Sequence, residues 1–197
     1  MFARRTASLL AAAVLAAAPS AAAAARHGHG SRRAHGAAHG CINADTPATA
    51  APRQVIRKAV VCLINSQRAS HGLPALHSRS RLDRSAQGWT NTMVASGQFT
   101  HGSDFAGRIA AAGYSWSFAG ENIATGFQTP RAVVTAWMAS TGHCENILSP
   151  DYADVGTGVS THTLGSFGPA TWTQDFGLRS GHSPPSSSHG PAAGCPY

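Results

Sequence analysis

Residues 170–178 read ATWTQDFGL, and this stretch indicates that the chain contains a sheet. Four of its side chains recur at every second position, which is the period of a β-strand: Trp172, Gln174, Phe176 and Leu178. Two other segments have strand character. DVGTGVST (154–161) alternates around two glycines, and GENIATG (120–126) is bounded by glycine at both ends. We therefore predict a small antiparallel sheet built from the second half of the chain.

Apolar side chains at helical spacing predict five helices around these strands. The predicted helices begin near residues 53, 82, 104, 129 and 140, and they end near residues 72, 97, 113, 138 and 148. Thr129 followed by Pro130 is typical of a helix start. Because helices and strands do not alternate regularly, the fold class that we predict is α+β, with the sheet between helices.

The two ends of the chain have compositions that cannot build a core. Residues 1–25 are typical of a secretory signal peptide, because Arg4 and Arg5 precede a short alanine-rich apolar run. Residues 26–52 read as a flexible linker rich in His, Gly, Arg and Ala, and residues 179–197 as a low-complexity tail. We expect one domain over residues 53–178 and a secreted, extracellular protein of bacterial type with no transmembrane segment.

The formal charge is +7, and the basic residues are scattered along the chain, with two clusters among them. One cluster is Arg53, Arg57 and Lys58, and the other is Arg79, Arg81 and Arg84. Neither is interleaved with aromatic residues, so we expect no nucleic-acid partner. Electrostatic attraction to an anionic cell-wall surface is the remaining expectation for these charges.

The four cysteines are an even number in a chain expected to be exported, and this indicates two disulfides. Four cysteines allow three pairings, between which the sequence does not decide. We favour Cys41–Cys62, which ties the N-terminal extension to the first helix, and Cys144–Cys195, which ties down the tail.

Three polar residues beside glycines are the candidates for chemistry: His101, Glu121 and His143. Two histidines and a carboxylate suit a divalent metal or a general acid–base pair. The sequence has no G-x-S-x-G, S-x-x-K or H-E-x-x-H motif that would indicate a known hydrolase nucleophile or zinc helix. The long spacing between the three residues leaves open whether they meet.

Five segments occur in an order that resembles one known family: LINSQRASHGLPAL (63–76), FTHGSDFAGRIAAAGY (99–114), AGENIATG (119–126), AWMASTGHCENIL (136–148) and WTQDFG (172–177). Together they resemble the CAP superfamily of cysteine-rich secretory, antigen 5 and pathogenesis-related 1 proteins, and in particular its bacterial branch. The resemblance implies a three-layer α–β–α sandwich whose central cavity is lined by histidines and glutamates.

The resemblance carries over residue by residue, and only in part. His101 matches the first family histidine and Glu121 the first glutamate, whereas the second glutamate falls near Ser140 and the second histidine at Thr171. The bacterial branch has another histidine, which is His143 here. The candidate ligands for Zn²⁺ or another divalent cation in the domain are His101, Glu121 and His143, with no cofactor required. The supporting residues that we expect are Asn122, Ser140, Asn146 and Gln174.

Three functions follow as expectations. The first is a monomeric, non-enzymatic extracellular protein whose cleft holds a small ligand, a lipid or a divalent cation at His101, Glu121 and His143. The second is an extracellular or cell-wall hydrolase that uses Glu121 as general base. The third is a structural or adhesive domain of the cell envelope, in which Glu121 accepts hydrogen bonds from backbone N–H groups. Fold-level analogy does not choose between these functions.

Overall fold

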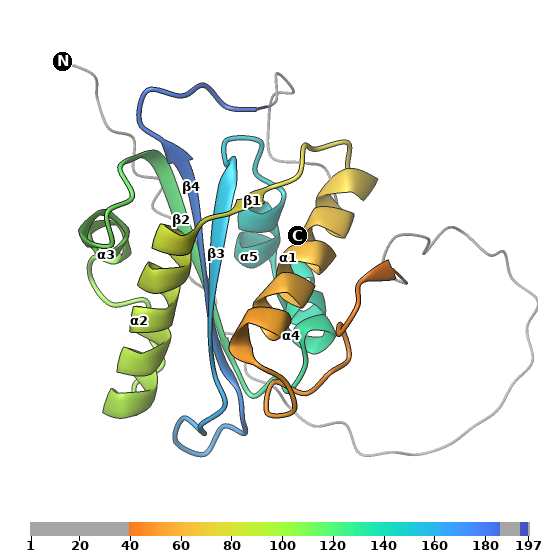
Figure 1. Cartoon of the computed structure of the whole chain (residues 1–197), viewed down its shortest axis with the longest axis vertical. Coiled ribbons are helices and arrows are strands. Elements are labelled where there is room, and N and C mark those ends of the chain that lie inside the picture. Colours follow the sequence, from red (N-terminus) through yellow and green to blue (C-terminus); the bar gives the residue numbers. More distant parts are fainter. Residues whose placement is uncertain (1–39, 186–193, 197) are drawn as a thin grey trace, which may run out of the picture.

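The computed structural model describes residues 40–185 and 194–196 (Figure 1). Its helices are α1 (Arg53–Ser70), α2 (Ser80–Ser96), α3 (Phe105–Ala111), α4 (Pro130–Met138) and α5 (Thr141–Ile147). Its strands are β1 (His77–Ser78), β2 (Trp116–Thr125), β3 (Asp154–Ser160) and β4 (Thr171–Arg179). All five predicted helices and all three predicted strands are present. The signal peptide and most of the predicted linker lie outside the described residues.

The strands form one sheet in the order β1-β3-β4-β2. The antiparallel prediction holds for β2 with β4 and for β3 with β4, and in the first of these pairs Glu121 lies opposite Asp175. Two features were not predicted. β1 pairs in parallel with β3 through two residues, which is too short a strand to show a period, and β2 begins at Trp116 rather than at Gly120.

The sheet is the middle layer of the three-layer sandwich that the sequence predicts (Figure 1). α2 and α3 cover one face, and α1, α4 and α5 cover the other. The largest apolar cluster lies on the second face, around Trp137, Trp172 and Phe176. On the first face α2 comes very close to β3, because Gly156 and Gly158 have no side chain to hold its backbone away.

The two disulfides are the pairs that we favoured. Cys41 is joined to Cys62 on α1, and Cys144 on α5 is joined to Cys195. The first bond changes the predicted domain boundary. Residues 41–52 are not a free linker, because Cys41, Ala44 and Ala48 are buried in the main apolar cluster. The packed domain therefore begins at Cys41 rather than at residue 53.

Both outer edges of the sheet are closed by side chains from helices. At β2, Trp137 donates from Nε1 to the carbonyl of Ile123 at 3.3 Å, and Asn146 donates from Nδ2 to the carbonyl of Glu121 at 3.2 Å. At β3, Asp83 accepts from the amide of Thr157 at 2.9 Å. These contacts satisfy backbone groups that would otherwise invite pairing with another strand.

A second α2 side chain completes the closure of β3. Gln87 accepts from the amide of Val159 and donates to its carbonyl, both at 3.1 Å.

None of the helices in the part of the chain that the structure describes is long and apolar enough to cross a bilayer.

Candidate functional site

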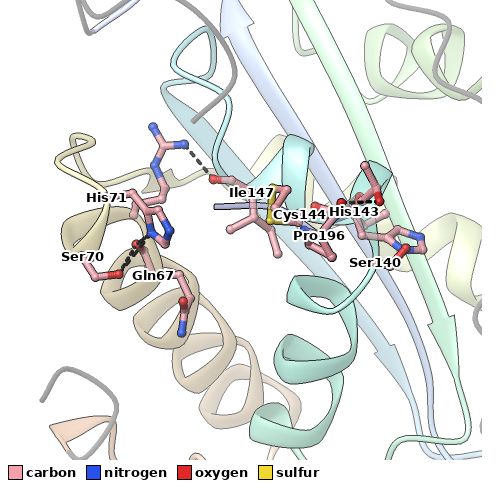
Figure 2. The surroundings of a disulfide bond; sticks show 12 residues. Gln67, Ser70, His71, Ser140, His143, Cys144, Ile147 and Pro196 are labelled. Carbon is pink, nitrogen blue, oxygen red and sulfur yellow. Dashed lines mark hydrogen bonds between the residues drawn. A yellow bond between two sulfur atoms is a disulfide. The ribbon is translucent and has the colours of Figure 1, made fainter. Parts of the chain in front are cut away.

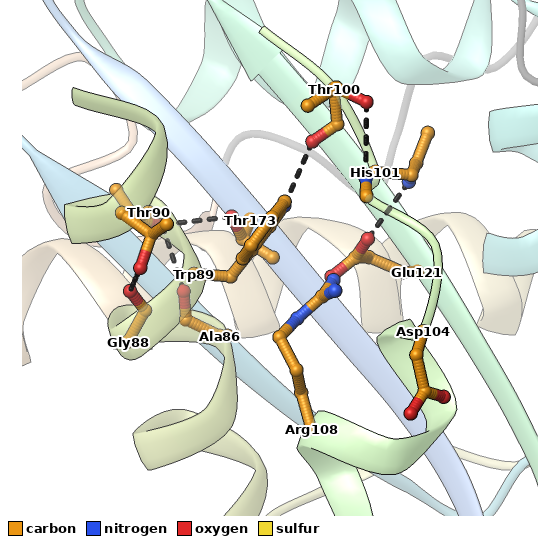
Figure 3. A network of polar contacts seen from close by, with 12 residues as sticks. Ala86, Gly88, Trp89, Thr90, Thr100, His101, Asp104, Arg108, Glu121 and Thr173 are labelled. Atoms are coloured by element: carbon orange, nitrogen blue, oxygen red, sulfur yellow. Dashed lines mark hydrogen bonds and ion pairs between the residues drawn. The ribbon is translucent and has the colours of Figure 1, made fainter. Parts of the chain in front are cut away.

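Glu121 of β2 is a buried carboxylate held by two side chains (Figure 3). His101 contacts its Oε1 through Nδ1 at 2.9 Å, and Arg108 donates from Nη2 to its Oε2 at 2.6 Å. Only 1% of the Glu121 side chain is exposed, whereas 24% of His101 and 22% of Arg108 are exposed. Because a carboxylate only accepts, the Nδ1 of His101 is the donor in this hydrogen bond.

The loop and the short helix next to α2 position these partners. His101 follows α2 on a loop that turns at Gly102, where a positive φ of 66° and the nearby Trp89 ring both favour glycine. Arg108 lies on α3, and its guanidinium stacks over the Trp89 ring at 3.7 Å from the centroid. Trp89 in turn donates from Nε1 to the carbonyl of Thr100 at 2.9 Å, which holds the His101 loop against α2.

Asp175 lies opposite Glu121 on β4, so two carboxyl groups are side by side in the sheet. Asp175 is 1% exposed, and neither of its side-chain oxygens accepts a hydrogen bond within the described residues. Burial raises the pKa of Asp175 well above its usual range, and the charge of Glu121 raises it further, against smaller opposing effects of Ser85 and Arg108. The neutral, protonated form of Asp175 is therefore favoured beside Glu121.

A second polar group lies on the other face of β2. Asn122 donates from Nδ2 to the carbonyl of His143 at 3.1 Å and contacts Oε1 of Gln174 at 3.4 Å. Asn146 donates to Oδ1 of Asn122 at 2.9 Å as well as to the carbonyl of Glu121. These amides connect α5 to the strand that carries Glu121, so the two groups share one edge of the sheet.

His143 lies on α5 next to the disulfide of Cys144 (Figure 2). Its Nδ1 is 2.9 Å from the hydroxyl of Ser140. Burial, with a smaller contribution from the charge of His101, lowers the pKa of His143 to about 4. His143 is therefore uncharged at neutral pH.

The structure pairs His101 with Glu121, and no hydrogen bond joins the ring of His143 to either of them within the described residues. Glu121 faces α3, whereas its neighbour Asn122 faces α5, because adjacent residues of a strand point to opposite faces. His143 accepts from Asn122 through its backbone carbonyl, while its ring contacts Ser140 and lies near enough to His101 for that charge to lower its pKa. Thr171, which stands where the family has its second histidine, is buried, and its hydroxyl lies 3.2 Å from that of Thr125.

The described residues give the predicted metal site no support. Among residues 40–185 and 194–196, no three His, Cys, Asp or Glu side chains are grouped so that they would hold a metal ion. Both oxygens of Glu121 already have partners, and the fixed positive charge of Arg108 opposes a cation there. Zinc or another divalent cation at His101, Glu121 and His143 stays a prediction that this geometry does not favour.

Sequence reasoning missed Arg108 and Asp175. Arg108 lies seven residues after His101, on a helix whose start is marked by Asp104, which accepts from the amide of Gly107. Only the packing of α3 shows that its guanidinium reaches Glu121. The alternation of 170–178 does place Asp175 on the face opposite Gln174, but its partner depends on the pairing of β4 with β2.

The chain belongs to the cysteine-rich secretory protein family, or CAP family, whose model matches residues 61–176. It is 39% identical over 135 residues to the uncharacterized protein YkwD of Bacillus subtilis. The aligned region covers 65% of this chain and 50% of that protein. It is 32% identical over 106 residues to the uncharacterized membrane protein YlbC of the same organism, covering 52% of this chain and 31% of that protein. The chain thus spans half or less of these relatives.

Solved structures share the fold at low sequence identity. An extracellular protein of Bacillus anthracis that contains an SCP domain matches with a TM-score of 0.57 at 24% identity, over 66% of this chain and 44% of that one. An outer surface protein of Borrelia burgdorferi matches with a TM-score of 0.56 at 22% identity, over 62% of this chain and 91% of that one. These similarities establish the fold and do not identify a ligand.

Proposed function

We propose that this protein is a secreted, non-enzymatic binding domain that holds a small amphiphilic ligand beside His101 and Arg108. The observation that carries the proposal is the state of Glu121. Its carboxylate is enclosed and has a partner at each oxygen. It therefore orients the partly exposed side chains of His101 and Arg108 rather than contacting a substrate itself. Secretion is supported by the signal-like N-terminus and by the extracellular or surface location of structural relatives.

The surroundings of the pair favour a ligand with a polar head and an apolar body. His101 offers an imidazole nitrogen and Arg108 a guanidinium, both suited to a carboxylate or phosphate head. Partly buried aromatic side chains lie next to them in one apolar cluster: Trp89, Phe99 and Phe167. Since a cation would meet the charge of Arg108, a lipid or small anion fits this position better than a metal does.

Calorimetric titration with palmitate tests the proposal, with Zn²⁺ as a parallel probe. We expect saturable palmitate binding by the wild type and a loss of about fivefold or more in affinity for His101→Ala, because one head-group partner is removed. His182→Ala is the matched control, since His182 is exposed and lies beyond β4. Absence of saturable palmitate binding by the wild type overturns the proposal that the ligand is a lipid. Zn²⁺ binding that is lost in His101→Ala and kept in His182→Ala would instead support a divalent cation as the ligand.

One observation favours hydrolysis as the second candidate. A histidine oriented by a buried carboxylate is the arrangement by which enzymes hold an imidazole ready to accept a proton. In this geometry the base would be His101, and Glu121 would be its positioning residue, which differs from the expectation that Glu121 is the base. Turnover of peptidoglycan or peptides that falls in both Glu121→Gln and His101→Ala supports this candidate. Turnover that is absent from the wild type removes it.

The structural or adhesive role makes a separate expectation. Glu121 accepts from the side chains of His101 and Arg108, not from the backbone N–H groups that this role assumed. If the network only held loops in place, Glu121→Gln would lower the melting temperature, and neither the wild type nor the variant would bind palmitate. Measuring melting and palmitate binding on the same variant separates the two roles.

A further inference from the structure

A second concave surface lies at the opposite edge of the sheet, between α1 and α2. It consists of two hollows of about 430 and 450 Å³ that share Arg57 and Asp83. β1 pairs only with Asp154 and Val155, so the rest of β3 has no strand beside it here within the described residues. The resulting cleft is of the size typical of ligand sites, and its floor includes the α2 side chains that close β3.

The fold brings together the two basic clusters that are separate in the sequence. Arg57 of α1 lines both hollows, Lys58 of α1 lines one of them and Arg84 of α2 lines the other. Among the described residues Asp83 is the one acidic side chain in the lining. Lys58 and Arg84 are exposed, and neither has an ion-pair partner among the described residues. The cleft therefore carries a net positive charge that the protein itself does not neutralise.

Arg57 lies at the centre of this surface and is incompletely bonded. It donates from Nη2 to Oε1 of Gln87 at 2.9 Å, while its buried Nε has no hydrogen-bond partner in the part of the chain that is described. A buried guanidinium nitrogen without a partner is unfavourable unless water or a ligand completes it. An anionic oxygen is the partner that a guanidinium accommodates best.

The uncharged lining distinguishes between classes of anionic polymer. It offers hydroxyl and amide groups at Ser78, Ser80, Gln54 and Asn91, and its one apolar side chain is Val61. No aromatic side chain among the described residues lines it, whereas proteins that bind single-stranded nucleic acid stack bases on aromatic rings. The lining therefore suits a chain that carries hydroxyl groups between its phosphates.

We propose that the cleft between α1 and α2 binds a polyol phosphodiester chain, with phosphates at Arg57, Lys58 and Arg84 and polyol hydroxyls at the neighbouring serines and amides. This site is separate from the one at Glu121 and does not depend on the function proposed there. Such a polymer would hold the domain on a phosphate-bearing envelope, and the site at Glu121 on the β2 edge would remain accessible to its own ligand.

Binding of poly(glycerol phosphate) to the full chain tests the proposal, measured by calorimetry at 0.15 M salt. We expect saturable binding that weakens about three- to fivefold in Lys58→Gln and in Arg84→Gln. Each substitution removes one exposed ion pair between the protein and a phosphate of the polymer. Asp83→Asn has the opposite expected effect, a gain of about the same factor. It removes the competing carboxylate while its amide oxygen still accepts from Thr157.

The matched control is Arg81→Gln, which makes the same charge change on the same helix. Arg81 lines neither hollow and turns toward Gly113, and charges beyond about 8 Å are screened at this salt, so we expect less than about a 1.5-fold change. Absence of saturable binding, or an equal loss in Arg81→Gln, overturns the proposal. Single-stranded DNA bound as tightly as poly(glycerol phosphate), with the same losses, also overturns it, because the cleft would then read phosphate charge alone.

Discussion

At the β2 edge of the sheet, side chains from α4 and α5 donate to strand carbonyls, whereas at the β3 edge side chains from α2 accept from strand amides and one of them, Gln87, also donates to a carbonyl. Both edges are closed to pairing with another chain. Their charges differ in kind. Behind β2, Glu121 and Asp175 are enclosed in the sandwich, while beside β3 the basic groups stand around an open cleft.

The difference shows that ionisable groups at the two edges serve different purposes. Burying charge at β2 is unfavourable unless every group has a partner, so the geometry there is tightly determined. The exposed cations beside β3, Lys58 and Arg84, remain solvated and need no particular partner within the protein. We therefore expect substitutions at the β2 edge to change stability and substitutions of the β3 cations to change binding alone.

The largest effect expected from a substitution is that of Arg108→Met. This variant leaves the enclosed Glu121 carboxylate without its cation, and we expect the free energy of unfolding to fall by about 3 kcal/mol. Urea denaturation at pH 7 measures it. Adding Glu121→Gln should recover part of the loss, because the unpaired charge is then removed. Arg84→Met at the other edge should change stability by less than about 0.5 kcal/mol, and an equal loss there would contradict the comparison.

The next effect concerns the amides that close β2. Asn146→Ala leaves the carbonyl of Glu121 and the Oδ1 of Asn122 without this donor, so we expect a loss of about 2 kcal/mol. Thermal and urea denaturation measure it. Gln87→Ala, which uncovers both backbone groups of Val159 at the β3 edge, is the matched variant and should cost a similar amount. A negligible effect of either variant would mean that water replaces the side chain at that edge.

His143 should make stability depend on pH in one window. Its folded pKa of about 4 lies below the unfolded value, so the unfolded chain binds a proton first and stability falls as pH drops from about 6.5 to 4. We expect His143→Gln to reduce this fall by up to about 3 kcal/mol. Comparing wild-type and variant urea midpoints across that range isolates the contribution. Parallel curves would show that His143 is not held in its neutral form.

The smallest effect is that of Asp175→Asn near pH 4, where it replaces a neutral carboxyl with a neutral amide of the same shape and should change stability by less than about 1 kcal/mol. Because the folded pKa of Asp175 is raised, its contribution is fully present below about pH 4 and declines as pH rises. The variant should therefore gain stability relative to the wild type as the pH rises above about 4. Urea denaturation at three pH values measures this, and a relative loss with rising pH would refute the assignment.

Elements with a clear period could be predicted from the sequence, and contacts between them only in part. Alternation in 170–178 identified β4, and the Thr129–Pro130 pair identified the start of α4, which Thr129 caps by accepting from Ala132. β1 has two residues and shows no pattern. The pairing of His101 with Glu121 followed from the family motifs. Arg108 and Asp175 did not, because their meeting with Glu121 depends on helix packing and strand register.

The second disulfide has a consequence for how the chain responds to a protease. Cys144 and Cys195 are covalently joined, and they are 51 positions apart in the sequence. Any single cut between them, including one in the tail after β4, yields two fragments that remain one molecule until a reductant is added. A nicked protein would therefore run as intact on a non-reducing gel and as two pieces on a reducing gel. Limited damage to the tail need not release any part of the domain.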